Sequence, residues 1–343
     1  MRVTVVATVL NEGQSVRGLL DSLLVQTRRP DEVVIVDGGS SDDTVSVVQS
    51  YGDRLPISVL VEEGCNISRG RNRAAEAATG DVIASTDAGV RLAPVWLEEL
   101  ARPFEMAKPM PSVVSGFFVA SPKTLFETAM GATVLPVQAE IDPDSFLPSS
   151  RSVAFTRQAW QAVGGYPEWL DYSEDLVFDL RLKELHGPFA WAPRAVAHFR
   201  PRTSLRAFFV QYYRYARGDG KADLWRKRHV VRYATYFVAL PGLVYLASSQ
   251  RPDWLVPLVA AVFAYCWTPW QRLRRIGRPL TRFQVVMAGS LVPLLRAVGD
   301  VAKMIGYPAG WFWRLRNWRR AEIHWRRPDG TEGSSGGPAD LQQ

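Results

Sequence analysis

The segment VVIVDGGSSDDT, Val33 to Thr44, decides the fold of the N-terminal part of this chain. A β-branched run ends at a carboxylate, two glycines follow, and Ser and Asp residues then supply an N-cap and first-turn acids for a helix that begins near Asp42. A strand, a tight turn and a helix in this order form the first half of a βαβ unit.

The same alternation recurs on both sides of this segment. Helical periodicity begins near Gln14 and Ser68, and three further β-branched runs predict strands at Thr4 to Val9, Ile57 to Val61 and Val82 to Ser85. We therefore expect an α/β fold with an open, mostly parallel sheet, helices on both faces and a nucleotide site.

The pattern changes beyond Pro94, where Pro and Gly become frequent. This change predicts longer loops and some antiparallel strands around a substrate cleft. A short helix is expected to start at Ser173. Pro188 and Pro193 are expected to bracket a strand that contains Phe189 to Ala192.

Composition narrows the classes of partner. The 343 residues carry a net charge of +7, and the basic residues crowd the last third, where they flank apolar runs. This pattern favours a surface that faces anionic lipid over a nucleic-acid groove. Cys65 and Cys266 lie too far apart for a disulfide framework or a metal-ligand motif, which indicates a reducing compartment. The N-terminus reads as a strand and not as a secretory signal, so the first domain is expected in the cytoplasm.

Two apolar stretches, Val230 to Ala247 and Trp254 to Trp270, are expected to cross a membrane as a hairpin joined by the turn Ser248 to Asp253. A third stretch, Phe283 to Phe312, contains charged residues and is expected to lie in the membrane interface. Two crossings would keep the basic loop Arg272 to Arg282 and the C-terminal tail on the cytoplasmic side. The alternative is that all three stretches are core helices of a soluble domain.

Two motifs follow the first two predicted strands. Thr8 and Glu12 lie near the end of the first strand, where ligands of open α/β sheets bind, although Asn11-Glu12 could also simply start a helix. Asp37 ends the second strand. Its carboxylate could accept a base N–H, or it could cap the following helix.

Two further motifs could carry the chemistry. Arg69 and Arg71 open a helix whose N-terminus suits a diphosphate, and Asp87 ends the next strand, where it could bind a divalent ion. The alternative is a solvated basic helix beside a turn aspartate. Glu174 and Asp175 form an acidic pair that could take a proton from an acceptor hydroxyl, although acids are also common in a first helical turn.

The order Leu-Asn-Glu, Val-Asp-Gly-Gly-Ser-Ser-Asp-Asp-Thr, Arg-Asn-Arg-Ala, Thr-Asp-Ala-Gly and Ser-Glu-Asp resembles the inverting family 2 glycosyltransferases with the GT-A fold, over roughly Arg2 to Arg217. The resemblance implies that Asp87 belongs to a metal-binding motif for Mg²⁺ or Mn²⁺ and that Asp175 is the catalytic base. It implies a nucleotide pocket lined by Thr8, Glu12, Asp37 and Arg71. Gly89 departs from the family pattern, which often has a second aspartate at that position.

The resemblance extends to the C-terminal side. His198 lies where similar enzymes place a residue near the metal or diphosphate, although a lone histidine at a strand end is more often structural. Gln211, Arg214 and Tyr215 resemble the acceptor-side motif of processive members, and the whole pattern resembles succinoglycan-type transferases. An amphipathic interfacial helix would explain the same residues.

These expectations define four parts: a GT-A catalytic domain (1–205), an acceptor-side amphipathic helix (206–228), a membrane hairpin with an interfacial helix (229–312), and a basic, then disordered tail (313–343). The expected function is transfer of a sugar from a nucleotide-sugar donor to a hydroxyl of a lipid-linked or polysaccharide acceptor, at the cytoplasmic membrane. The alternatives are a polyprenyl-phosphate sugar synthase and a non-catalytic membrane scaffold.

Overall fold

The computed structural model describes residues 1–249, 252–275 and 280–326, which form two compact units. Unit 1 comprises Met1–Val119, Gln138–Phe199 and the described residues from Arg319 onward. Unit 2 comprises Ala120–Val137 and Arg200–Trp318. A catalytic domain was expected over residues 1–205, whereas residues 120–137 and 200–205 belong to the helical unit.

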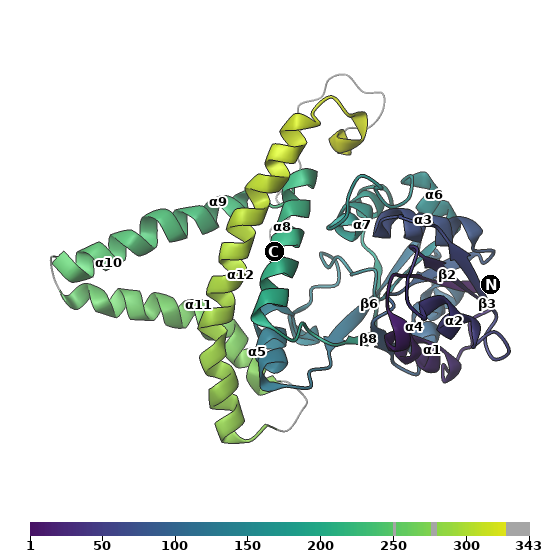
Figure 1. Cartoon of the computed structure of the whole chain (residues 1–343), viewed down its shortest axis with the longest axis horizontal. Helices are drawn as coiled ribbons and strands as arrows, with labels where there is room; N and C mark the ends of the chain where they lie inside the picture. Colours follow the sequence, from purple (N-terminus) through teal and green to yellow (C-terminus); the bar gives the residue numbers. More distant parts are fainter. Residues whose placement is uncertain (250–251, 276–279, 327–343) are drawn as a thin grey trace. The chain divides into compact units, whose positions relative to one another are not determined.

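Unit 1 is built on an eight-stranded sheet with the order β3-β2-β1-β4-β7-β6-β8-β5 (Figure 1). The strands are β1 (Val3–Val9), β2 (Glu32–Asp37), β3 (Ile57–Val61), β4 (Val82–Ser85), β5 (Val90–Leu92), β6 (Val113–Ala120), β7 (Val153–Thr156) and β8 (Ala190–Phe199). The pairs β1/β2, β2/β3 and β1/β4 are parallel, and β4/β7, β6/β7 and β5/β8 are antiparallel. The four predicted strands and the antiparallel strands expected beyond Pro94 are confirmed.

The sheet is covered on both faces because side chains alternate along each strand. On β1, Val5 packs into the core that contains Leu19 of α1 and Leu97 of α4. The neighbouring residue Val6 packs into the opposite core, with Ala74 of α3. The α/β architecture with helices on both faces is therefore confirmed.

The four helices of unit 1 whose starts were predicted begin within three residues of those positions. Near Gln14 the chain first forms the 3₁₀ helix η1 before α1, and α7 begins directly after Ser173. The helical elements are η1 (Gly13–Val16), α1 (Arg17–Leu24), α2 (Thr44–Gln49), α3 (Ile67–Ala77), α4 (Trp96–Met106), η2 (Gln138–Glu140), α6 (Arg157–Ala162), α7 (Glu174–His186) and η5 (Ala321–His324).

The prediction that Pro193 ends a strand is wrong. Strand β8 continues through Pro193 to Phe199. Proline removes one backbone donor but keeps its carbonyl, and the carbonyl oxygen of Pro193 accepts a hydrogen bond from Gln138 Nε2 at 2.8 Å. The strand pairs with β5 further along, in the register Val90 opposite Phe199.

Unit 2 consists of helices around a separate apolar core that includes Met130, Phe208, Cys266 and Leu295. Its elements are α5 (Leu125–Val134), α8 (Leu205–Ala222), α9 (Arg226–Ala234), the π-helical turn η3 (Thr235–Ala239), α10 (Leu240–Ser249), η4 (Pro252–Trp254), α11 (Leu255–Arg275) and α12 (Arg282–Arg316).

Helices α8 and α12 run side by side at close range (Figure 1). Two glycines of α12 make this approach possible. A Cβ added at Gly306 would lie 2.2 Å from the carbonyl oxygen of Tyr213, and one added at Gly310 would lie 2.1 Å from that of Arg217. The two backbones therefore touch where no side chain intervenes.

Two helical segments in the described part of the chain are long and apolar enough to cross a membrane, Arg226–Ser249 and Arg282–Arg316. The first contains the first predicted crossing. The second contains the stretch that was expected to lie in the interface, and α11, the other predicted crossing, is not among the two. The C-terminal half of α11 carries Trp267, Pro269 and Gln271, which lower its apolar character. The three charged residues of α12 that argued for the interface lie within eight residues of each other, so most of that helix is uncharged.

Three expectations fall partly or wholly outside the described residues. They are the turn from Ser248 to Asp253, the loop from Arg272 to Arg282, and the disordered tail after residue 326.

Candidate active site

The loops after β1 and β2 hold each other in place. The backbone N–H of Asn11 donates to Ser40 Oγ at 2.8 Å, and the Asn11 side-chain oxygen accepts from the backbone N–H of Ser41 at 2.9 Å. Thr44 Oγ1 accepts from the backbone N–H groups of Glu12 and Gly13, at 2.9 and 2.8 Å. The carboxyl end of the sheet therefore presents a defined surface at the place where open α/β folds bind ligands.

Asp37 organises the second of these loops. Its Oδ1 accepts from the backbone N–H groups of Gly39 and Ser40 at 2.9 and 2.8 Å, and its Oδ2 accepts from Ser40 Oγ at 2.5 Å. The residue is only 1% exposed. Helix α2 begins later, after Asp43, so the cap reading of Asp37 is wrong: Asp37 closes an Asx turn and does not cap the helix.

Arg71 is the centre of the acidic site. It lies in the first turns of α3, where Asn66 caps the helix, and its guanidinium is almost fully buried. Nη2 donates to Asp87 Oδ1 at 2.8 Å, and Nη1 donates to Glu174 Oε1 at 2.6 Å. Arg71 therefore joins the residue that follows β4 to the first residue of α7, which are far apart in the sequence.

Asp87 has a second cationic neighbour, Arg151, which was not predicted. Arg151, just before β7, places Nε 3.2 Å from Asp87 Oδ2. Burial tends to raise the pKa of Asp87, but the guanidinium groups of Arg151 and Arg71 outweigh it and hold the pKa below its usual value. Asp87 is therefore ionised at neutral pH, and about a quarter of its side chain remains exposed.

The acidic pair begins α7 directly after Ser173, whose φ of +63° turns the chain sharply into the helix. Burial, and then the charge of Asp175, raise the pKa of Glu174 to about 7. Burial also raises the pKa of Asp175, while Arg71 and Arg151 oppose the rise. Two adjacent carboxyls thus share one partly buried, cationic environment, which favours proton exchange near neutral pH.

A third acid of α7, Asp179, lies behind this pair and was not predicted. It is 1% exposed, and its Oδ2 has no hydrogen-bond partner among the described residues. Burial and the charge of Asp175 raise the pKa of Asp179 well above its usual value. Next to it in the core, the ring of Tyr166 stacks on Phe178 with the centroids 4.0 Å apart. The sequence signal that could have identified Asp179 is its position one helical turn after Asp175.

The remaining predicted donor-site residues are placed as follows. Thr8 packs against α3, where a Cβ added at Gly70 would lie 2.8 Å from the Thr8 methyl group. Glu12 accepts from Ser15 Oγ at 2.5 Å. Arg69 is half exposed and forms an ion pair with Glu62, with Nη2 2.5 Å from Oε1. Arg69 thus turns away from the bonds that Arg71 makes.

His198 lies on β8 opposite Arg91 of β5. Burial, and to a lesser extent the charge of Arg91, lower its pKa, so the imidazole is neutral near pH 7. Among the described residues, no hydrogen bond or ion pair joins His198 to Asp87. The described part of the chain also contains no cluster of three or more His, Cys, Asp or Glu side chains placed to hold a metal ion.

The predicted acceptor-side residues all lie on α8, in unit 2. Gln211 Nε2 donates to the hydroxyl of Tyr215 at 2.7 Å, one helical turn away. Arg214 lies between them in sequence and is exposed. The motif therefore forms a short polar strip along one helix.

Comparison with known proteins agrees with this geometry. Residues 4–146 match the family model described as Glycosyl transferase family 2. The succinoglycan biosynthesis protein ExoA of Rhizobium meliloti is 28% identical over 274 residues, which cover 76% of this chain and 82% of ExoA. The pre-mycofactocin glycosyltransferase of Mycobacterium tuberculosis is 30% identical over 323 residues, which cover 88% of this chain and 64% of that protein.

Other relatives match over shorter stretches. An uncharacterized glycosyltransferase of Escherichia coli, YibD, is 31% identical over 100 residues, 29% of each chain. The match to a validoxylamine A glucosyltransferase of Streptomyces hygroscopicus covers 22% of that protein. This chain therefore spans less than a third of the length of these two relatives.

Among solved structures, a mannosyltransferase of Pyrobaculum calidifontis in complex with GDP-Man and Mn²⁺ is similar with a TM-score of 0.52, over 93% of this chain and 88% of that one. The sequence identity is 19%, so the likeness concerns the fold. Together with the arrangement of the sheet, these findings show that the chain contains a glycosyl transferase family 2 domain with the GT-A fold.

Proposed function

We propose that this protein is an inverting, metal-dependent glycosyltransferase that moves a sugar from a nucleotide-sugar donor to a hydroxyl of a membrane-associated acceptor. The observation that carries the proposal is the position of Arg71, which binds Asp87 just after the carboxyl end of β4 and Glu174 at the start of α7. A donor-side acid and an acid-base pair are thereby held by a single buried cation.

In this proposal Asp175 removes the proton of the acceptor hydroxyl. The acceptor oxygen then bonds to the anomeric carbon from the face opposite the nucleotide, and the bond from that carbon to the phosphate oxygen breaks. The electron pair leaves with the nucleoside diphosphate, and the configuration of the sugar inverts. Glu174 orients Arg71 through their 2.6 Å bond. Burial raises the pKa of Asp175, which makes it a stronger base than an exposed aspartate.

The residues present fit a divalent ion such as Mg²⁺ or Mn²⁺ that is shared with a donor diphosphate. Mg²⁺ is commonly held by one or two carboxylates together with substrate phosphates, and Asp87 offers one ionised, partly exposed carboxylate. When bound, such an ion offsets negative charge on the leaving diphosphate. Arg71 and Arg151 would contribute positive charge on the same side.

We place Thr8, Glu12, Asp37 and Arg69 on the donor side and Gln211, Arg214 and Tyr215 on the acceptor side. Support for a lipid-linked or polysaccharide acceptor comes from relatives such as ExoA, a succinoglycan biosynthesis protein. The two helical segments that could cross a membrane support attachment to a membrane. We place the catalytic domain on its cytoplasmic side because basic residues flank the apolar stretches of the last third. We also place His198 near the metal.

The test is an assay of nucleotide release and sugar transfer with the detergent-solubilised full chain. A panel of GDP- and UDP-sugars is offered with a membrane lipid extract, with Mg²⁺, with Mn²⁺ or with a chelator. We expect release with at least one donor, loss of release with chelator, and an inverted product by NMR. Asp87→Ala should weaken binding of both metal and donor. No release with any donor or metal, or retention of configuration, would overturn the proposal.

A further inference from the structure

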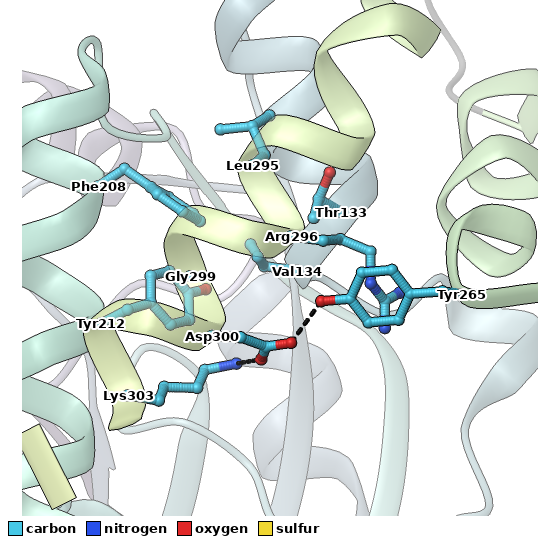
Figure 2. A pocket seen from close by; sticks show the side chains of 10 residues that line it. All are labelled: Thr133, Val134, Phe208, Tyr212, Tyr265, Leu295, Arg296, Gly299, Asp300 and Lys303. Carbon is cyan, nitrogen blue, oxygen red and sulfur yellow. Dashed lines mark hydrogen bonds and ion pairs between the residues drawn. The ribbon is translucent and has the colours of Figure 1, made fainter. Parts of the chain in front are cut away.

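Unit 2 contains a cavity of about 160 Å³ that the proposed chemistry does not use. Side chains from α5, α8, α11 and α12 line it, and Figure 2 shows them converging on one space. The wall from α5 and α8 is largely apolar, with Val134 and Phe208. The wall from α12 carries Arg296, Asp300 and Lys303.

The single carboxylate that lines this cavity already has partners. Asp300 Oδ1 accepts from Arg232 Nε at 2.8 Å, and Oδ2 accepts from the hydroxyls of Tyr265 and Tyr236. Lys303 Nζ lies at the outer limit of an ion pair with Asp300, at 4.0 Å (Figure 2). The negative charge of Asp300 is therefore largely taken up by Arg232 and the two hydroxyls.

The two cations of the cavity are held mainly by aromatic rings. The guanidinium carbon of Arg296 lies 4.0 Å from the ring centroid of Tyr265, and Lys303 Nζ lies 5.0 Å from that of Tyr212. Among the described residues, Arg296 has no carboxylate within ion-pair distance. Ring contacts orient a cation without neutralising it, so the cavity keeps a surplus of positive charge.

Arg296 and Lys303 are seven residues apart on α12, which places them on the same face of the helix, two turns apart. This helix is also one of the two segments that could cross a membrane. Charged residues inside such segments are costly unless they serve a partner, and basic pockets between membrane helices bind lipid head groups. Arginine matches the geometry of phosphate oxygens especially well.

We propose that this cavity binds the phosphate or diphosphate head group of an anionic membrane lipid, with Arg296 and Lys303 as the anion-binding residues. The apolar wall at Val134 and Phe208 contacts the first carbons of the lipid chain. The inference rests on the proposed function only in so far as that function places unit 2 at a membrane. Two kinds of lipid have a phosphate head group on an apolar chain and could occupy the cavity: a prenyl diphosphate that carries an acceptor, and a bulk phospholipid.

The test uses the purified full chain in phosphatidylcholine nanodiscs, with farnesyl diphosphate as the probe and farnesol as the uncharged comparison. We expect saturable binding of farnesyl diphosphate and none of farnesol. Arg296→Gln and Lys303→Gln should each weaken binding by about tenfold, as expected for the loss of one charge-assisted contact. The matched control is Arg282→Gln, an exposed arginine at the start of the same helix, which should leave affinity within about twofold.

Arg296→Lys keeps the charge and provides a second variant in case removal of the charge disturbs folding. It should retain binding better than Arg296→Gln. Nanodiscs that contain phosphatidylglycerol identify the source. Competition with the probe indicates a bulk phospholipid site, and undiminished probe binding indicates a prenyl diphosphate site. Equal affinity of the wild type and both charge-removing variants, or binding of farnesol as tight as that of farnesyl diphosphate, would overturn the inference.

Nucleotide release is measured on the same samples, so that the two proposals can fail separately. A chain that turns over a donor but does not bind the probe contradicts only the lipid site. A chain that binds the probe through Arg296 but turns over no donor contradicts only the proposed transferase activity.

Discussion

Two clusters of buried or half-buried charges, one in each unit, have opposite surpluses. In unit 1, two guanidiniums, those of Arg71 and Arg151, face four carboxyls: Asp87, Glu174, Asp175 and Asp179. In unit 2, Arg232 and Lys303 lie within ion-pair distance of the carboxylate of Asp300, and a third cation, Arg296, lines the same cavity. A surplus of carboxyls holds protons or a metal ion, whereas a surplus of cations attracts an anion. The same kind of ionic network therefore points to different ligands in the two units.

The largest expected effect is the loss of transferase activity in Asp175→Asn, in the carboxyl-rich cluster of unit 1 (called the acid-rich cluster below). The amide cannot take up the proton of the acceptor hydroxyl, so we expect kcat to fall by about 10²–10⁴ while donor affinity changes little. Steady-state kinetics and donor titration measure the two effects. Glu184→Gln, an exposed acid on the same helix, is the control and should retain activity. An active Asp175→Asn enzyme would show that the proton goes elsewhere.

Arg71→Met tests whether one buried cation holds the acid-rich cluster together. The substitution leaves Asp87 and Glu174 without their shared partner, and loss of one member of a buried ion pair costs about 3–5 kcal/mol of unfolding free energy. Urea denaturation followed by tryptophan fluorescence measures the loss. Arg69→Met, two residues earlier on the exposed side of the same helix, should leave the midpoint nearly unchanged. Similar losses in both variants would contradict a central role for Arg71.

Asp300→Asn tests the cation-rich cluster of unit 2 by removing its carboxylate. Arg232 loses its charged partner, so we expect a loss of about 1–3 kcal/mol in the unfolding free energy of the full chain. Because the positive surplus grows, affinity for farnesyl diphosphate should rise. The exposed Asp253→Asn is the control for both measurements. A fall in probe affinity would show that Asp300 helps to form the site and does not oppose the anion.

The smallest expected effect is a pH dependence of stability that traces to Glu174. A carboxyl whose pKa is about 7 in the folded state and near 4.5 when unfolded keeps its proton more tightly in the native chain over that interval. The contribution of Glu174 is therefore fully present at low pH and is lost as the pH rises from about 4.5 to about 7. The urea midpoint of Glu174→Gln should depend less on pH than that of the wild type. An unchanged slope would rule out Glu174 as the titrating group.

Much of the fold was predictable because short-range patterns encode it. The β-branched runs that end at Val9, Asp37 and Ser85 form strands within one residue of the predicted bounds. The caps and first-turn residues placed α2, α3 and α7 within two residues. These signals depend on residues a few positions apart, so the local sequence is sufficient to read them.

The sequence indicated which acids and bases could carry chemistry, but not how they pair. It singled out Arg71, Asp87 and Glu174. It could not show that Arg71 joins the other two, because one of those contacts spans 103 positions. Arg151 was missed for the same reason: it belongs to no motif, and only the packing of β7 brings it to the site. Asp179 was missed although it lies one helical turn after Asp175, because only the structure shows that this face of α7 is buried.

The membrane segments show the same division. The sequence alone determined that the last third is apolar, helical and flanked by basic residues. The charges of α12 argued for an interfacial helix because their partners were not visible. In the folded chain Asp300 pairs with Arg232, 68 positions away, and Arg296 rests on Tyr265. A local pattern records the cost of a charge, whereas only the tertiary structure brings together the groups that offset it.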